Sequence, residues 1–151
     1  MLRGKFAIVV SRFNAEVTDG LVRGALEALG ENGFVSAQVD IFDAPGAFEL
    51  PLLAQALAET ENYLGVIALG CVIKGDTAHF EHISNAAALG LMQAGLSTGV
   101  PIAFGVLTTY TEEQAIVRSR PGVENKGRES ALAVLSSARS LERFKSITSS
   151  N

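Results

Sequence analysis

Short unbroken apolar runs alternate along this chain with longer segments whose apolar residues recur at helical spacing. Four of these runs predict strands, at Lys5–Val10, Ala37–Phe42, Leu64–Ile73 and Pro101–Thr108. The third run is apolar throughout, as expected for the centre of a parallel sheet that is covered on both faces. The pattern therefore favours buried strands over a sheet with one face in water.

The segments between these runs predict helices, over Ala15–Asn32, Glu49–Thr60, His79–Leu96, Glu112–Arg118 and from Asn125 to about Phe144. Asn14 and Asn125 are plausible N-caps, and Thr111 with Gln114 resembles a capping box. The polar tail Ser146–Asn151 is expected to fray. Strands that alternate with helices predict one domain, residues 1–151, with a parallel sheet between two helical layers.

Ligands of such sheets bind outside the carboxyl ends of the strands. The four loops at those ends are Ser11–Asn14, Ala44–Glu49, Lys74–His79 and Thr108–Thr111. They hold the chemically interesting side chains, apart from those between Arg118 and Lys126. The connections at the opposite ends look like plain turns. This asymmetry predicts a functional site at one edge of the sheet.

The segment Asn85–Gly99 carries no charge and is apolar on nearly every side. Either it is buried within the chain, or it packs against a neighbouring subunit. Charged residues make up 19% of the chain and hydrophobic residues 48%, against about 25% charged in typical domains. A small domain has little room for a helix buried on all sides, so the composition favours a subunit interface.

The net charge and the cysteine content narrow the range of possible functions. The net charge of −4 argues against bulk attraction to nucleic acid or an anionic membrane. No apolar run approaches the roughly 20 residues of a membrane span, and we expect no signal peptide. The single cysteine, Cys71, lies in an apolar run and is expected to be a buried hydrophobe in the reducing cytoplasm.

The stretch Gly75–Ala78 precedes a helix, and backbone N–H groups at such a start bind anions. It lacks Walker A spacing, and a plain cap by Asp76 or Thr77 is the alternative. His79 follows directly and suits proton transfer near neutral pH. A metal site at His79 and His82 would lack further histidine or cysteine ligands, so we expect none.

Other loop residues suit binding. Phe13 can stack on a planar ring, Asn14 can pair with polar groups, and Glu49 can accept hydrogen bonds from hydroxyls. Arg118 and Lys126 can bind a phosphate. Each has a plainer alternative. Phe13 could be a hydrophobic staple, Asn14 a helix cap and Glu49 an acid in a first turn. Arg118 and Lys126 could be ordinary solvated charges. Together these residues predict condensation or elimination on a phosphorylated small molecule, without naming the substrate.

Five segments resemble the lumazine synthases, the penultimate enzymes of riboflavin biosynthesis. They are Val9–Asn14, Ala44–Pro51, Ala68–Ile83, Phe104–Arg118 and Asn125–Leu132, in the family's order and spacing. The resemblance implies condensation of 5-amino-6-(D-ribitylamino)uracil with 3,4-dihydroxy-2-butanone 4-phosphate, giving 6,7-dimethyl-8-ribityllumazine, phosphate and water without metal or cofactor. The expected fold is a three-layer α/β/α sandwich with a four-stranded parallel sheet in the flavodoxin-like order 2-1-3-4.

The resemblance also implies roles for individual residues. His79 would be the catalytic acid and base. The residues expected to bind the pyrimidine and ribityl groups are Phe13, Asn14, Ala47, Phe48, Glu49, Val72, Ile73, Phe104 and Lys126. The residues expected to bind phosphate are Gly75, Asp76, Thr77 and Arg118. Phe104 and Lys126 would come from the adjacent subunit of a cytoplasmic homo-oligomer, at least a pentamer.

Two departures leave the size of the assembly open. Little chain precedes the first strand, and Ser119–Glu124 lacks the turn found in members that form sixty-subunit shells. We favour a free pentamer. A binding module that has lost catalysis is a second hypothesis, which the complete set of pocket residues disfavours. A receiver domain is a third, but Ser11–Asn14 stands where it would need an acidic pair.

Overall fold

A computed structural model describes residues 2–149 of the chain. Its four strands are β1 (Lys5–Ser11), β2 (Val39–Ala44), β3 (Tyr63–Ile73) and β4 (Ile102–Thr109). All pairings are parallel, and the strand order is β2-β1-β3-β4. The predicted parallel sheet and its order 2-1-3-4 are therefore confirmed.

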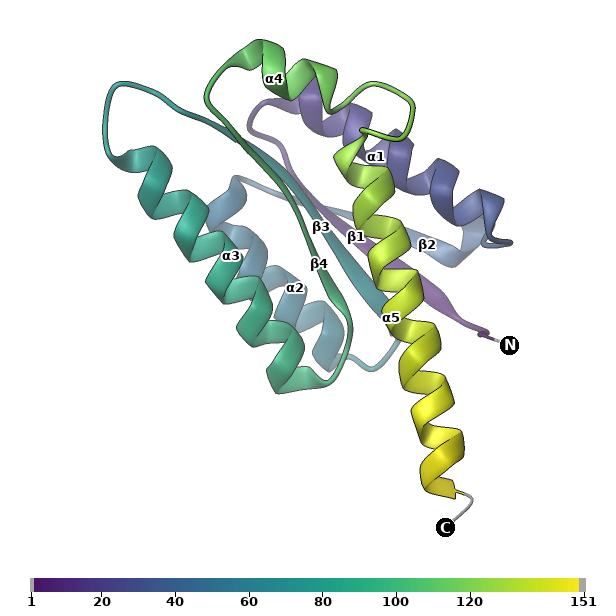
Figure 1. Cartoon of the computed structure of the whole chain (residues 1–151). Coiled ribbons are helices and arrows are strands. Elements are labelled where there is room, and N and C mark those ends of the chain that lie inside the picture. Colours follow the sequence, from purple (N-terminus) through teal and green to yellow (C-terminus); the bar gives the residue numbers. More distant parts are fainter. Residues whose placement is uncertain (1, 150–151) are drawn as a thin grey trace.

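Helices cover both faces of the sheet (Figure 1). The long helices α1 (Ala15–Glu31) and α5 (Lys126–Ser149) pack together on one face. On the other face lie α2 (Leu50–Glu59) and α3 (His79–Thr98). The short helix α4 (Glu112–Val117) follows β4, and one-turn 3₁₀ helices occupy Ser36–Gln38 and Ala47–Glu49. This arrangement confirms the three-layer α/β/α sandwich.

Strand β1 shows why the sheet lies at the centre. Successive side chains of a strand point to opposite faces. Phe6, Ile8 and Val10 join the core beneath α1 and α5, while Ala7 and Val9 join the core beneath α2 and α3. All five are fully buried. An unbroken apolar run thus supplies two cores at once.

The predicted bounds of the second strand and the end of the last helix were wrong. The second strand begins at Val39 rather than Ala37, because Ser36–Gln38 form a 3₁₀ turn, and it continues to Ala44. The last helix continues to Ser149 through most of the tail that was expected to fray. No glycine or proline follows Gly127, so no helix breaker interrupts it. The final residues, 150–151, lie outside the described part.

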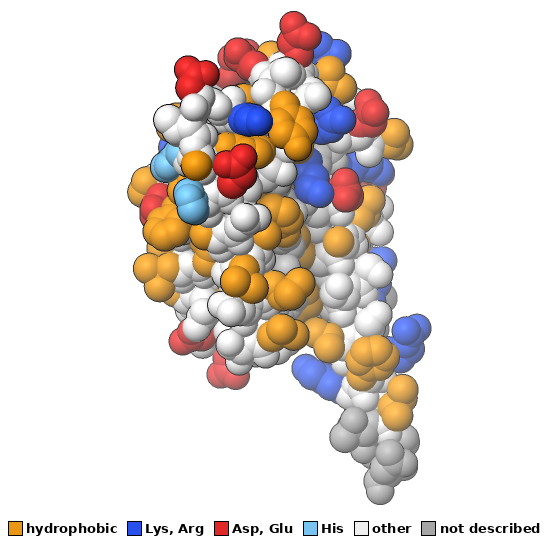
Figure 2. Space-filling view, turned by 60° about the vertical axis from the view of Figure 1, so that its left-hand side comes forward, with side chains coloured by type: hydrophobic (Ala, Val, Ile, Leu, Met, Phe, Trp, Pro, Cys, Tyr) orange, Lys and Arg blue, Asp and Glu red, His pale blue; other side chains and the backbone are white. Residues whose placement is uncertain are grey.

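Helix α3 has one buried and one exposed face. Ala87, Leu91 and Ala94 are buried against the chain, whereas Met92 is 65% exposed and Leu96 is 80% exposed. Figure 2 shows hydrophobic side chains gathered on one face of the molecule. The alternative of full burial within the chain is therefore wrong. None of the helices in residues 2–149 is long and apolar enough to cross a membrane.

Candidate functional site

A cavity of about 610 Å³ opens at the carboxyl ends of the strands. The loops after β1, β2 and β3 and the first turns of α3 form its walls. Its lining residues are Phe13, Pro45, Gly46, Ala47, Phe48, Glu49, Cys71, Val72, Ile73, Gly75, Thr77, His79, Phe80 and Ile83. We call this space the first cavity. It brings together most of the side chains that the sequence selected.

Phe13 and Asn14 lie on the loop between β1 and α1. Phe13 is 71% exposed, so it does not act as a staple on the helix. Asn14 is the N-cap residue of α1, as predicted, but its backbone is left-handed, with φ 61°, and its side chain makes no cap hydrogen bond. The amide Nδ2 of Asn14 instead donates to the Cys71 carbonyl, 3.0 Å away. This bond joins the loop to β3.

The turn after β2 supplies the opposite wall. Ala47, Phe48 and Glu49 form a single 3₁₀ turn that leads into α2. Ala47 is buried and fixes the turn on the sheet, while Phe48 remains 59% exposed. The pair Phe13 and Phe48 therefore offers two exposed aromatic surfaces on a cavity whose lining is mostly apolar, which suits a planar ring.

The loop after β3 is exposed from Lys74 to His79. The N–H of Lys74 donates to the Thr109 carbonyl at 2.9 Å, and the N–H of His79 donates to Thr77 Oγ1 at 3.3 Å. A Cβ on Gly75 would meet nothing within 4 Å. This open space, next to the start of α3, suits an anion. Asp76 belongs to the loop but does not line the first cavity.

His79 opens α3 and lines the first cavity, whereas His82 does not. Within residues 2–149, no three histidine, cysteine, aspartate or glutamate side chains gather as they would around a metal ion. Cys71 is free, and burial raises the pKa of its thiol to about 11. The thiol is therefore neutral near pH 7 and cannot serve as a thiolate nucleophile. His79 is the residue of this wall best suited to proton transfer.

A second cavity of about 350 Å³ lies beside β4 and the start of α5. It is lined by Phe104, Val106, Leu107, Thr108, Thr109, Arg118, Glu124, Lys126 and Glu129. The two cavities share no lining residue. Arg118 was expected to join Gly75, Asp76 and Thr77 at one phosphate. Within the chain it lies instead with Phe104 and Lys126.

Each basic residue of the second cavity, Arg118 and Lys126, is bonded to a nearby residue of the chain. Arg118 Nη1 donates to the Gln114 carbonyl at 3.0 Å. Gln114 belongs to the predicted capping box with Thr111, which is confirmed by bonds of 3.1 and 3.3 Å. Lys126 Nζ lies 3.4 Å from Glu129 Oε1. Arg118 is thus bonded to a neutral carbonyl and keeps its charge for an anion, whereas Lys126 shares its charge with Glu129.

Sequence reasoning missed several lining residues of the first cavity, among them Pro45, Gly46, Cys71, Phe80 and Ile83. Phe80 and Ile83 lie on the first turns of α3, on the face that carries His79. Helical spacing from His79 is a signal that could have identified Ile83. Cys71 was interpreted only as a core residue, although β3 carries it to the end of the sheet.

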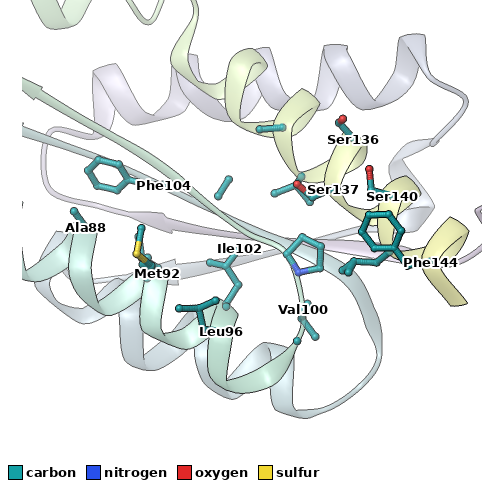
Figure 3. A pocket seen from close by; sticks show the side chains of 18 residues that line it. Ala88, Met92, Leu96, Val100, Ile102, Phe104, Ser136, Ser137, Ser140 and Phe144 are labelled. Atoms are coloured by element: carbon teal, nitrogen blue, oxygen red, sulfur yellow. The ribbon is translucent and has the colours of Figure 1, made fainter. Parts of the chain in front are cut away.

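A third hollow, of about 740 Å³, is a groove between α3 and α5 with β4 as its floor. Figure 3 shows Ala88, Met92 and Leu96 on one side of it and Ser136, Ser140 and Phe144 on the other. Phe104 stands at its far end and also lines the second cavity. The groove is mostly apolar and carries none of the predicted proton-transfer or phosphate-binding residues.

Comparisons with known proteins agree with the resemblance noted in the sequence. The model of the family described as 6,7-dimethyl-8-ribityllumazine synthase matches residues 3–142. A protein of Caulobacter vibrioides (strain ATCC 19089 / CIP 103742 / CB 15) named 6,7-dimethyl-8-ribityllumazine synthase 1 is 62% identical over 141 residues. That match covers 93% of this chain and 92% of the relative.

Proposed function

The chain belongs to the 6,7-dimethyl-8-ribityllumazine synthase family, and from that membership we propose that its first and second cavities form two halves of one active site. The enzyme is a transferase of riboflavin biosynthesis. It condenses 5-amino-6-(D-ribitylamino)uracil with 3,4-dihydroxy-2-butanone 4-phosphate, and the products are 6,7-dimethyl-8-ribityllumazine, phosphate and water. In the proposed arrangement, each site lies between two adjacent subunits.

The first cavity would bind the pyrimidine. Phe13 stacks on the ring, which its exposure of 71% permits. Val72 and Ile73 line the ring pocket at the end of β3. Asn14, Ala47, Phe48 and Glu49 contact the ribityl chain and nearby polar groups. Asn14 keeps its Oδ1 as an acceptor, because the bond to Cys71 uses only its Nδ2.

The loop after β3 would bind the phosphorylated substrate and move protons. The backbone at Gly75, Asp76 and Thr77 faces the phosphate in the open space beside the start of α3. His79 transfers protons as the amine condenses with the ketone, as phosphate leaves, and as the second ring closes. Much of the acceleration comes from holding the two substrates together.

A dianionic phosphate beside Gly75 calls for a cation, and Arg118 is suited to it through paired N–H groups. The proposal of a shared site is supported above all by the position of Arg118. It lines the second cavity with Phe104 and Lys126, and that cavity shares no residue with the first. An adjacent subunit that presents its second cavity to the first cavity would supply all three.

The apolar surfaces support an assembly of this kind. Leu89, Met92 and Leu96 expose a hydrophobic face of α3, and the groove between α3 and α5 continues it to the second cavity. Contacts that join different patches on neighbouring copies close into a ring when the rotation from one copy to the next closes. We expect at least a pentamer, and we place it in the cytoplasm, where the free Cys71 would stay reduced.

Mixing two slow variants tests the shared site. His79→Ala damages one half and Arg118→Ala damages the other. In assemblies formed from equal amounts of both chains, about a quarter of the sites would combine two intact halves by random placement. We expect kcat/KM of the mixture to rise to about a quarter of the wild-type value, measured by absorbance of the lumazine product.

The matched control mixes His79→Ala with a His79→Ala, Arg118→Ala double variant, which can form no intact site. Its activity should not exceed that of the single variant, because every site lacks His79 and about half also lack Arg118. If the first mixture also stayed at that level, with co-assembly verified by a tag on one chain, both halves would belong to one chain. That result would overturn the shared site and leave the family assignment untouched.

A further inference from the structure

The loop that joins Arg118 to Lys126 is anchored by one buried side chain. Its outer residues, Arg120 to Glu124, are exposed, whereas Asn125 is 1% exposed. The N–H of Lys126 donates to the Arg118 carbonyl at 3.0 Å. This bond closes the loop, so that the backbones of Arg118 and Lys126, the two basic residues of the second cavity, lie side by side. A contact that holds this part of the backbone in place therefore positions both cations.

Asn125 is bonded to three separate parts of the chain. Its Nδ2 donates to the Gly20 carbonyl of α1 at 3.2 Å and to the Arg120 carbonyl of the loop at 3.0 Å. Its Oδ1 accepts from the N–H of Arg128 at 3.0 Å, which confirms the predicted cap of α5. The cap uses only the oxygen. The amide nitrogen donates both of its N–H groups to other parts of the chain, and a serine or aspartate cap lacks these donors.

Helix α1 is shaped to receive this anchor. A Cβ on Gly24 would overlap the amide of Asn125, and a Cβ on Gly20 would overlap the backbone of Ser119. A Cβ on Gly127 would overlap the backbone of Leu21. Three glycines therefore let the loop and the start of α5 lie directly on α1. Such close packing leaves the anchored end of the loop little freedom to shift.

We infer that Asn125 is a positioning residue for the phosphorylated substrate, because its amide sets the places of Arg118 and Lys126. This inference rests on the proposed role of Arg118 at the phosphate. Asn125 itself lies beneath the loop and is absent from the lining of the second cavity. Its influence on the reaction is therefore indirect and passes through the two cations.

The test is Asn125→Ser. Serine retains an oxygen that can cap α5, but it lacks the two N–H donors to Gly20 and Arg120. We expect KM for 3,4-dihydroxy-2-butanone 4-phosphate to rise about threefold to tenfold, the equivalent of about one lost hydrogen bond. The change in kcat should stay below about twofold, because His79 and its loop are untouched.

A double-variant cycle separates positioning from general stability. In an Arg118→Ala background, Asn125→Ser should add less than about twofold to KM, because Arg118, the one of the two cations that is proposed to bind the phosphate, is gone. Asn32→Ser is the matched control, since Asn32 also donates its amide to a backbone carbonyl, that of Ala28 at 2.8 Å. It lies at the far end of α1 and should lower the melting temperature without changing KM.

Three outcomes decide the matter. An additive effect of Asn125→Ser in the Arg118→Ala background, or an unchanged KM with a lowered melting temperature, would overturn the inference alone. An unchanged KM in Arg118→Ala itself would overturn the proposed role of Arg118 and the inference with it. If Asn125→Ser does not fold, Asn125→Thr carries the same test, because it fills more of the space and keeps a capping oxygen while losing both N–H donors.

Discussion

The two loops that carry the proposed phosphate ligands are held in opposite ways. The loop from Lys74 to His79 is exposed along its length, and Gly75 faces open space. The loop from Arg118 to Lys126 closes on itself and is anchored through Asn125, with the glycines of α1 packed tightly beneath it. One loop is open where a substrate would lie, and the other is organised before any substrate arrives.

This difference suits the two tasks that we propose. An anchored cation loses little freedom on binding, so more of its attraction for phosphate appears as affinity. An exposed loop admits two substrates and releases a product, which an enclosed one could not do without moving. The open loop thus carries the proposed proton transfer and one side of the phosphate site, and the anchored loop carries the proposed cation. The following variants test this division.

The largest expected effect is on the open loop. His79→Ala should lower kcat by about 10²- to 10⁴-fold, the usual contribution of general acid–base catalysis. Turnover should remain above the uncatalysed rate, because both substrates are still held together. His82→Ala, three residues further along α3 and outside the first cavity, should leave kcat unchanged. Complete loss of turnover in a folded His79→Ala assembly would contradict this assignment.

The next effect concerns how tightly each loop is packed. Gly127→Ala should lower the free energy of unfolding by about 3 kcal/mol, because its Cβ would overlap the Leu21 backbone in a region that cannot easily yield. Urea unfolding at fixed subunit concentration measures this.

Gly75→Ala is the matched change in the open loop. We expect its unfolding free energy to stay within about 0.5 kcal/mol of the wild type, because its Cβ would meet no other atom within 4 Å. Its KM for the phosphorylated substrate should rise instead, since the methyl group would occupy the space proposed for phosphate. Equal loss of stability in both variants would remove the distinction between the loops.

The smallest effect is electrostatic. Arg128, three residues after Asn125, holds Glu31 of α1 through two bonds of 2.7 and 2.8 Å. The hydrogen bond to Arg128 lowers the pKa of the exposed Glu31 below its ordinary value of 4.5. The ion pair thus stabilises the fold above pH 4.5, and this stabilisation is lost as the pH falls through the lowered pKa of Glu31.

Glu31→Gln should therefore melt slightly below the wild type at pH 7, and the difference should vanish well below pH 4.5. Added salt should shrink it at pH 7, because the pair is exposed. Thermal melts across this pH range measure the effect. A difference that grows towards acid pH would show that the ion pair does not stabilise the contact between α1 and α5.

The parallel sheet and most residues of the first cavity could be predicted from the sequence, whereas the strand order 2-1-3-4 was expected from the family resemblance. Apolar runs such as Val66–Ile73 mark buried strands whatever surrounds them, and parallel strands bring their following loops to one edge. Phe13, Glu49 and His79 were therefore expected together and lie around one cavity. Asn14 is the N-cap residue of α1, as predicted, but its side chain makes no cap hydrogen bond and instead donates to Cys71 of β3.

The class of fold, the family and the loops with the candidate site residues were predictable from the sequence, because they follow from local hydrophobic pattern and from motifs. The separation of Arg118 from Gly75 and the anchoring of its loop by Asn125 became visible only in the folded chain. The amide of Asn125 reaches a carbonyl 105 residues earlier in the chain. Contacts between such distant segments depend on how helices pack across a face of the sheet, and no local pattern records that.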